Sequence, residues 1–374
     1  MHLGFVVYGG LDGTSGGYRY DRRLADYCRD CGDTVDVIAL PERGYWRRVA
    51  DGVAPAVTRQ LDRPVDVLLE DELCHPSLWR QHRRLDRPGA VAALVHHVAS
   101  DRPPGRLPRL RRWIERRYLR SVDGAVCTSA FTRQRAARLA PGLAESTVAP
   151  PAGRTEGAAA TPGDVRRRAA AGPLRIAFVG NLVPRKDPLT LLDAVNRLAG
   201  RANAPDWEVT VVGSHAAAPA YADQVVEAAA DRGLDDRVRF AGEVADEDLL
   251  DVLEASHVCC VPSTYEGFGM VYLEAMEHGV VPIASATGGA GEFVTDGDNG
   301  ALVEPGDADR IAALLADWAA DRDRLAALGV AALETAAAHP GWAETLSTVR
   351  GVLQELAPDE PTPDPSVTLR EGRP

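Results

Sequence analysis

The sequence predicts an α/β protein built from two doubly wound domains. Continuously apolar segments of strand length alternate with segments of helical periodicity, which is typical of a parallel sheet covered by helices on both faces. A chain of 374 residues is also long for a single core. The alternation stops at residue 150, gives way to Pro, Gly, Ala, Thr and Arg until residue 172, and then starts again.

The first domain is expected over residues 1–150. Its first strand is followed by a loop that holds five glycines within residues 9–17, and then by a helix in which Tyr20, Leu24 and Tyr27 recur at helical spacing. Gly32 is suited to end that helix. The expected strands are residues 3–8, 35–40, 65–69, 90–95, 125–128 and 147–149.

A linker, 151–173, is expected to lead into a second domain over residues 174–338. A helical stretch within 339–357 is expected to pack back across the domains, and the polar, Pro-rich residues 358–374 are expected to be disordered. The strands expected in the second domain are residues 175–179, 208–212, 238–240, 258–262 and 281–284.

Composition excludes several classes of protein. The net charge of −12 argues against a nucleic-acid binder, and no apolar run is long enough to cross a bilayer. The start of the chain lacks a signal-peptide pattern, and the six cysteines are scattered, so reduced thiols in the cytoplasm are expected. Cys28 and Cys31 form a lone C-x-x-C on a helix, for which packing is favoured over redox or metal chemistry.

Residues 262–279 are the most informative segment. An apolar strand leads into a turn that presents Glu266, and glycines follow before a helix that carries Glu274. Glycines let backbone N–H groups approach an anion, and the start of a helix adds a partial positive charge. Carboxylates on either side are acceptors for the hydroxyl donors of sugars. This pattern predicts a nucleotide-sugar site with a cradle for the pyrophosphate.

Lys186 is the only lysine among 42 basic residues. It follows Arg185 just after an expected strand. A compact, flexible charge at a phosphate is poorly replaced by arginine, which would explain why this lysine persists. Chance survival of one lysine is the alternative.

These motifs identify a resemblance. The segments 179–187 and 266–274, the second with two glutamates eight positions apart, resemble the retaining glycosyltransferases of family 4, within glycosyltransferase group 1. The resemblance implies the GT-B fold, in which two Rossmann-like domains face each other across a cleft. It extends to the glycines before the first helix, to the histidines after residue 95, and to the glycine-containing loops 288–292 and 296–300.

The resemblance implies a role for each matching residue. Arg185 and Lys186 would bind the donor pyrophosphate, Glu266 the sugar hydroxyls and Glu274 the ribose. The active-site histidine would be His96, with His97 as the alternative. Further donor contacts would come from the N-terminal glycines, from main-chain groups after Glu266 and from a main-chain contact to the base: Gly16, Gly17, Phe268, Gly269, Met270 and Val244.

Plainer interpretations remain open at this point. Glu266 could be a turn residue and His96 a core histidine. The Asp246-Glu-Asp248 sequence fits a metal–diphosphate motif, but these acids suit the start of a helix, so no metal or other cofactor is expected. Residues 102–120 hold eight arginines, which suit a solvated helix or an anionic lipid surface. Glu72 and His75 are further acceptor-side candidates.

The expected activity is metal-independent transfer of a hexose from UDP- or GDP-sugar to a hydroxyl of a glycan, a lipid-linked saccharide or another acceptor, with retention of configuration. Location is expected in the cytoplasm, with peripheral membrane contact left open. The alternatives are a GT-B sugar phosphorylase, a nucleotide-sugar epimerase or a catalytically silent binding subunit. Dehydrogenases and P-loop nucleotidases are rejected because the glycine spacing after the first strand and the Gly-Lys-Ser/Thr motif are absent.

Overall fold

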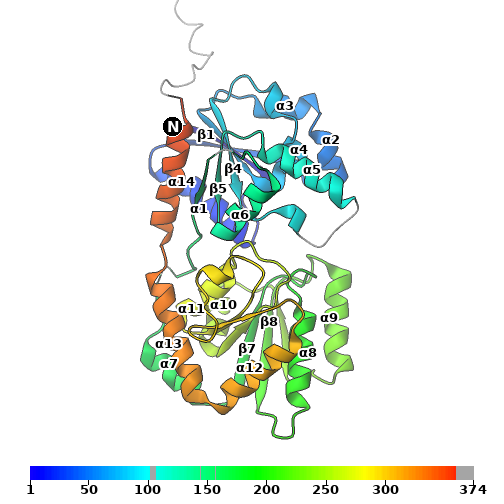
Figure 1. The fold of residues 1–374 in the computed structure, drawn as a ribbon, viewed down its shortest axis with the longest axis vertical. Helices are drawn as coiled ribbons and strands as arrows, with labels where there is room; N and C mark the ends of the chain where they lie inside the picture. The colour runs from blue at the N-terminus through cyan, green and yellow to red at the C-terminus, as the bar shows by residue number, and fades with distance from the viewer. Residues whose placement is uncertain (102–106, 144, 156, 359–374) are drawn as a thin grey trace, which may run out of the picture. The chain divides into compact units, whose positions relative to one another are not determined.

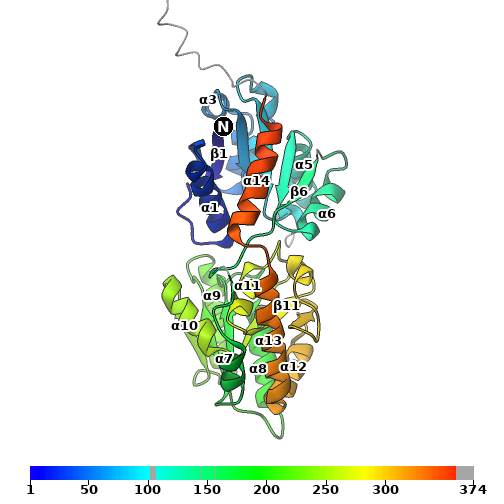
Figure 2. The ribbon, with the colours of Figure 1, turned by 90° about the vertical axis from the view of Figure 1, so that its left-hand side faces the viewer.

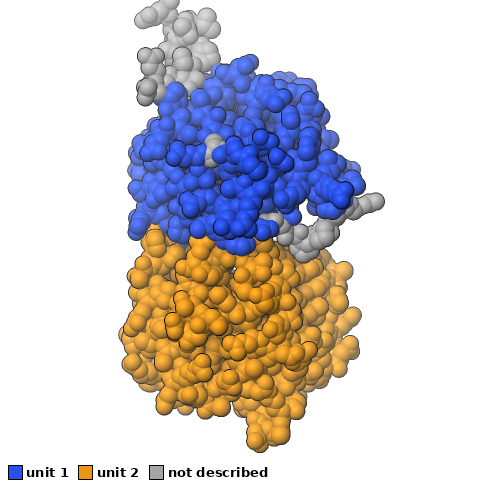
Figure 3. All heavy atoms as spheres, in the orientation of Figure 1, with its two compact units in different colours: residues 1–151, 343–374 blue, residues 152–342 orange. Residues whose placement is uncertain are grey.

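The structure is a computed structural model that describes residues 1–101, 107–143, 145–155 and 157–358. The chain divides into two compact units (Figure 3), the first made of Met1–Pro151 and Ala343–Pro374 and the second of Ala152–Trp342. Each unit is built on a parallel sheet of six strands (Figure 1). The expected α/β fold with two doubly wound domains is therefore confirmed, whereas the cleft between them stays a prediction.

The sheet of the first unit has the strand order β2-β1-β3-β4-β5-β6. The chain starts in the interior of the sheet and then winds outward in both directions, which is the doubly wound pattern. Its strands are β1 (His2–Tyr8), β2 (Thr34–Leu40), β3 (Val67–Asp71), β4 (Ala90–Val95), β5 (Gly124–Cys127) and β6 (Ser146–Val148).

The helices of the first unit connect and cover these strands. They are α1 (Gly16–Asp30), α2 (Tyr45–Asp51), α3 (Pro55–Leu61), η1 (Glu72–Cys74), α4 (His75–Leu78), η2 (His82–Arg84), η3 (Ala99–Asp101), α5 (Pro108–Leu119) and α6 (Ala130–Leu139).

The last helix, α14 (Trp342–Leu356), packs on the first unit although it follows the second unit in sequence (Figure 2). Arg350 on this helix forms an ion pair with Asp33 at 2.7 Å, and the hydroxyl of Thr345 donates to the carbonyl of Pro150 at 2.6 Å. The residues expected to form a disordered tail lie, from 359 on, outside the described part of the chain.

The sheet of the second unit has the order β12-β11-β10-β7-β8-β9. Its strands are β7 (Leu174–Val179), β8 (Trp207–Val212), β9 (Val238–Gly242), β10 (Val258–Cys260), β11 (Val281–Ser285) and β12 (Ala301–Val303). Its helices are α7 (Pro162–Ala169), α8 (Pro188–Ala199), α9 (Pro219–Asp231), α10 (Asp246–Ala255), α11 (Met270–Glu277), η4 (Gly289–Glu292), α12 (Ala308–Ala320) and α13 (Arg322–Ala338).

The segment expected to be a linker, 151–173, groups with the second unit from Ala152 on. It contains a short helix, α7, which begins with a capping box formed by Thr161 and Asp164. Arg168 on α7 donates to the carbonyls of His278 and Gly279, both at 2.8 Å. These bonds and the packing of α7 against α13 fix the segment to the second unit.

Each unit has its own apolar core, in which the buried side chains of the strands meet those of the helices. Among the described residues, no helix combines the length and the apolar content that are needed to cross a membrane. All six cysteines are free thiols, and five of them are buried.

Candidate functional site

In the second unit, two loops meet at the carboxyl edge of the sheet. One loop follows β7 and carries Arg185 and Lys186, and the other follows β10 and carries Glu266. β7 and β10 are neighbours and run parallel, so their carboxyl ends lie at the same edge. The backbone N–H of Thr264 donates to the carbonyl of Arg185 at 2.8 Å, which ties the two loops together.

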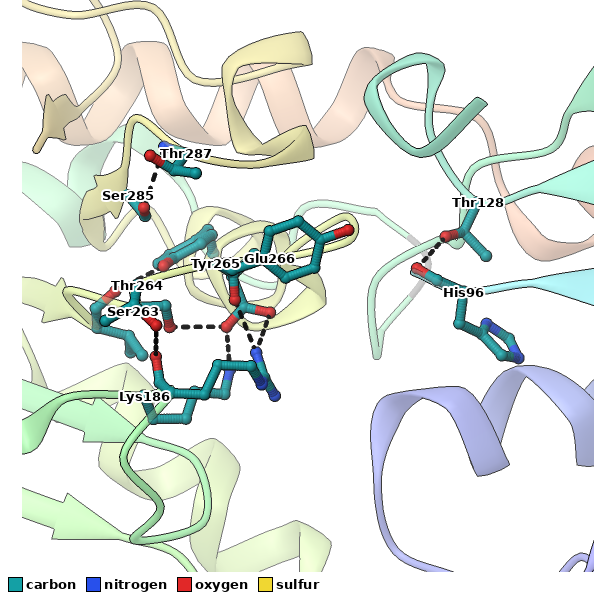
Figure 4. A network of polar contacts seen from close by, with 12 residues as sticks. His96, Thr128, Lys186, Ser263, Thr264, Tyr265, Glu266, Ser285 and Thr287 are labelled. Carbon is teal, nitrogen blue, oxygen red and sulfur yellow. Dashed lines mark hydrogen bonds and ion pairs between the residues drawn. The ribbon is translucent and has the colours of Figure 1, made fainter. Parts of the chain in front are cut away.

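Glu266 is the centre of a buried charge cluster (Figure 4). One carboxylate oxygen accepts hydrogen bonds from Lys186 Nζ at 2.5 Å and from the hydroxyl of Ser263 at 2.7 Å. The other oxygen lies 2.9 Å from Arg185 Nη1. Burial alone would raise the pKa of Glu266, but Arg185 and Lys186 outweigh burial and lower this pKa to about 2. The carboxylate is therefore charged at neutral pH.

The cluster keeps a surplus of positive charge and of hydrogen-bond donors. Two cations face one carboxylate, which leaves one net positive charge. An ammonium group has three donors and a guanidinium has five, and Glu266 engages only part of them. The side chain of Arg185 is 30% exposed, so a ligand can reach it. The cluster is suited to bind an anion.

The start of α11 adds backbone donors beside this cluster. Gly269 precedes the helix with φ of 95°, and a Cβ at this position would lie 2.6 Å from the ring of Tyr272, so only glycine fits. The first N–H groups of a helix have no partner within the helix. Met270 is the first residue of α11, while the side chain of Phe268 stacks on Phe293 with 4.9 Å between the ring centroids. The backbone of this turn, not the Phe268 ring, is what a ligand could use.

Glu274 lies on α11 and is 4% exposed. Arg154 Nη2 lies 3.5 Å from a carboxylate oxygen of Glu274, and Arg154 also forms an ion pair with Asp246. Asp246 begins α10, two residues after the half-buried Val244. Through Asp246 and Arg154, the segment with Val244, which was expected to contact the base, is therefore connected to Glu274. The buried carboxylate thus has the polar partner that its burial requires.

Arg154 is a residue that the sequence analysis missed, because it lies in the segment read as a linker. Its backbone N–H donates to a carboxylate oxygen of Glu277 at 2.8 Å, and that of Thr155 does so at 3.1 Å. Glu277 is one turn after Glu274 on α11. Glu274 and Glu277 therefore both bind the segment around Arg154, where the chain enters the second unit, to α11.

In the first unit, His96 follows β4 and lies at the start of α1. A Cβ on Gly17 would be in ordinary contact with the His96 ring, at 3.5 Å, and Gly16 is the first residue of the helix. His96 Nε2 lies 2.8 Å from Asp21, which is fully buried. Burial works against protonation, but Asp21 prevails and raises the pKa of His96 to about 9. The imidazole is therefore positively charged at neutral pH.

Asp71, at the end of β3, lies close to Asp21 and His96 and forms a cluster with them. Burial, and then the neighbouring Asp21, raise the pKa of Asp71 to about 7. Asp21, Asp71 and His96 place ligand atoms within 4.8 Å of one another, as Glu72, His75 and Glu115 also do, so either set could hold a metal ion. Without a metal ion, the charged His96 and the raised pKa of Asp71 make the first set a proton-sharing network.

Two further expectations concern segments outside these sites. Asp246-Glu-Asp248 forms the first turn of α10, as expected for a helix start. Of the arginine-rich residues 102–120, the structure describes 107–120, which include α5. Residues 102–106 lie outside the described chain.

Comparison with known proteins finds a family match within the second unit. Residues 165–335 match the family model described as glycosyl transferases group 1. A D-inositol 3-phosphate glycosyltransferase of Corynebacterium diphtheriae is 34% identical over 205 residues, which are 53% of this chain and 48% of that protein. One of Mycobacterium sp. strain KMS is 38% identical over 186 residues, 47% of this chain and 39% of that protein. The chain thus spans about half the length of these relatives or less.

Solved structures show the same fold. A sucrose-phosphate synthase from Thermosynechococcus elongatus superposes with a TM-score of 0.77 at 20% identity, covering 95% of this chain and 98% of that one. Anabaena HepE in complex with UDP-glucose superposes with a TM-score of 0.76 at 17% identity, covering 95% of this chain and all of that one, 100%. Together with the two six-stranded parallel sheets, these likenesses confirm the GT-B fold class.

Proposed function

Because residues 165–335 form a glycosyl transferases group 1 domain, we propose that this protein transfers a hexose from a nucleotide-sugar to an acceptor hydroxyl with retention of configuration. The observation that carries the proposal is the buried cluster in which Arg185 and Lys186 both face Glu266. This cluster presents net positive charge beside the start of α11, where a diphosphate would be bound.

The cluster would act on the leaving group. When the bond between the sugar and the diphosphate breaks, negative charge grows on the departing phosphate oxygen. Arg185 and Lys186, held in place by Glu266, would stabilise this charge without first having to reorganise. Two side-chain cations supply the charge that a metal ion would otherwise bring, so we propose that no metal is needed.

The remaining donor contacts are proposed from the same geometry. The main-chain groups of Phe268, Gly269 and Met270 would contact the sugar and phosphate, and Glu266 would accept from sugar hydroxyls. Glu274, oriented by Arg154, would accept from the ribose hydroxyls. The main chain at Val244 would contact the base.

UDP is our first choice of nucleotide, because HepE, which has the same fold, is seen with UDP and with UDP-glucose. GDP is the second choice. The acceptor is proposed to be a glycan or a lipid-linked saccharide, with the reaction in the cytoplasm and peripheral membrane contact if the acceptor is lipid-linked. His96, charged and held by Asp21, would interact with the transferred sugar from the first unit, with Gly16 and Gly17 beside it.

Calorimetry and thermal-shift measurements on the full chain with UDP, GDP, ADP and their common sugars, with EDTA throughout, test the donor site. The variants are Arg185→Ala/Lys186→Ala and Glu274→Ala. Two exposed arginines of the second unit provide a matched control, Arg201→Ala/Arg324→Ala. We expect one nucleoside diphosphate to bind wild type and the control, and to be lost from the other two variants.

Other outcomes would favour the alternatives. Binding of inorganic phosphate and sugar phosphate without any nucleotide would indicate a phosphorylase. Conversion of the bound nucleotide-sugar without an acceptor would indicate an epimerase. Nucleotide binding with no turnover on any glycan or lipid-linked acceptor would point to a binding subunit, and no binding at all would refute the donor-site assignment.

A further inference from the structure

A second concentration of positive charge lies in the first unit. A cavity of about 360 Å³ is lined by residues of η2, of α5 and of the segments next to them. The lining includes Arg80, Arg83, Arg116, Arg117 and Arg120 and no acidic residue. We call it the arginine pocket. Five guanidinium groups around one cavity are conspicuous in a chain whose net charge is −12.

The charges of the arginine pocket are not balanced by the protein. Within the described residues, none of the five arginines forms an ion pair with a carboxylate, and Nε of Arg117 is buried without a hydrogen-bond partner. Burial, and then the nearby Arg83 and Arg80, lower the pKa of Arg117. Like charges held close together in this way are stabilised when an anion enters.

Apolar side chains stand beside these charges on α5 and at its start. Leu107, Leu110 and Trp113 are 61%, 40% and 48% exposed. Leu110 and Trp113 are three residues apart on α5, so they follow one side of the helix, and Leu107 directly precedes its first residue. They make up half of the six large apolar side chains that the described chain leaves exposed.

Two tryptophan rings line the arginine pocket together with the arginines. Trp79 and Trp113 lie edge to face with 5.3 Å between their centroids. The guanidinium of Arg117 is 5.7 Å from the Trp79 ring and 5.8 Å from the Trp113 ring. Tryptophan and arginine beside exposed apolar residues are typical of helices that lie in a membrane interface.

The arginine pocket is separate from the edge of the sheet that carries His96. His96 follows the carboxyl end of β4, whereas α5 ends at Leu119 and leads into the amino end of β5. In a parallel sheet these ends lie at opposite edges. The pocket is therefore not a part of the sugar-transfer site described above.

We propose that α5 docks on an anionic lipid surface, with phospholipid phosphates in the arginine pocket and Leu107, Leu110 and Trp113 in the interface. Arginines attract anionic headgroups, and the apolar side chains gain burial in the acyl boundary. A soluble phosphate compound would satisfy the charges but would leave these three apolar side chains in water. A lipid surface accounts for both the arginines and the exposed apolar side chains. This proposal does not depend on the assignment of the donor site.

Flotation of the full chain with vesicles tests this proposal. Vesicles of phosphatidylcholine alone are compared with vesicles that also contain phosphatidylglycerol. The charge variant is Arg116→Gln/Arg117→Gln/Arg120→Gln, and the apolar variant is Leu110→Ser/Trp113→Ser. A matched control, Arg87→Gln/Arg138→Gln/Arg201→Gln, removes the same charge from exposed positions elsewhere. Thermal unfolding and UDP binding of every variant report whether it is folded.

We expect wild type and control to float with the phosphatidylglycerol vesicles, less so as salt is raised. The charge variant should bind them weaker by on the order of 100-fold, since each basic residue near such a surface contributes about a factor of five. The apolar variant should also bind less. Equal binding of folded wild type and charge variant, or no vesicle binding, would overturn the proposal. Calorimetric binding of inorganic or glycerol phosphate without vesicle binding would assign the pocket to a soluble ligand instead.

Discussion

Replacing Glu266 by glutamine tests the charge cluster directly. The change Glu266→Gln keeps the shape of the side chain but removes the only negative charge between Arg185 and Lys186. The fall of the Glu266 pKa from 4.5 to about 2 corresponds to about 3 kcal/mol in favour of the folded, ionised form. Only 8% of the Glu266 side chain is exposed, so solvent screens little of its interaction with the two cations.

Hydrogen exchange of the full chain measures this loss of stability in the segments around Glu266. We expect peptides from β10 and α11 to exchange on the order of 100-fold faster in Glu266→Gln than in wild type at neutral pH. Peptides from β1 and β4, in the first unit, should not change. Glu334→Gln, at an exposed position on α13, is the matched control.

The pH dependence of exchange shows whether the ionised form of Glu266 is the one that stabilises the fold. Since the folded pKa of Glu266 lies below its ordinary value, its stabilisation is complete above pH 4.5 and is lost as the pH falls towards 2. Wild type and Glu266→Gln should therefore converge in acid. Equal exchange at neutral pH, or a difference that persists unchanged in acid, would refute the account of the cluster.

Three further predictions concern other positions. Lys186→Arg should weaken UDP binding about tenfold in calorimetry, because the side chain is 13% exposed and a guanidinium does not replace a compact ammonium here; unchanged affinity would contradict this. Asp21→Asn should lower the pKa of His96 from about 9 in NMR titration, because the largest charge that opposes burial is removed while Asp71 and Glu72 remain; a value still near 9 would assign the shift to another group. Gly213→Ala should cost about 3 kcal/mol in urea unfolding, because its Cβ would lie 2.0 Å from a backbone oxygen; Gly306→Ala, with open space, should cost about 1 kcal/mol.

Much of the fold was predictable because it depends on local patterns. Every strand expected from the sequence is present, with small differences at its ends. The strand that was missed is β12, Ala301–Val303, which has three residues and follows a glycine turn. So short an apolar run gives too little periodicity to separate it from a loop.

The site was predictable only in part. Arg185 and Lys186 contact Glu266 because each lies beside a strand end, and the topology of a parallel sheet brings strand ends together. Their roles toward a donor stay a prediction from the resemblance. Arg154 and Asp21 were not found. Their partners, Glu274 and His96, are 120 and 75 positions away in sequence. Nothing in the local pattern around either residue marks such a long-range pairing.

The division of the chain has a consequence for how a shortened gene product would fail. The second unit is one uninterrupted stretch, whereas the first unit depends on α14, which follows the second unit in sequence. A frameshift or a protease cut just after Ala343 would leave the second unit intact in sequence. It would strip a helix from the other half, together with the ion pair between Arg350 and Asp33. A cut behind the second unit thus damages the first unit.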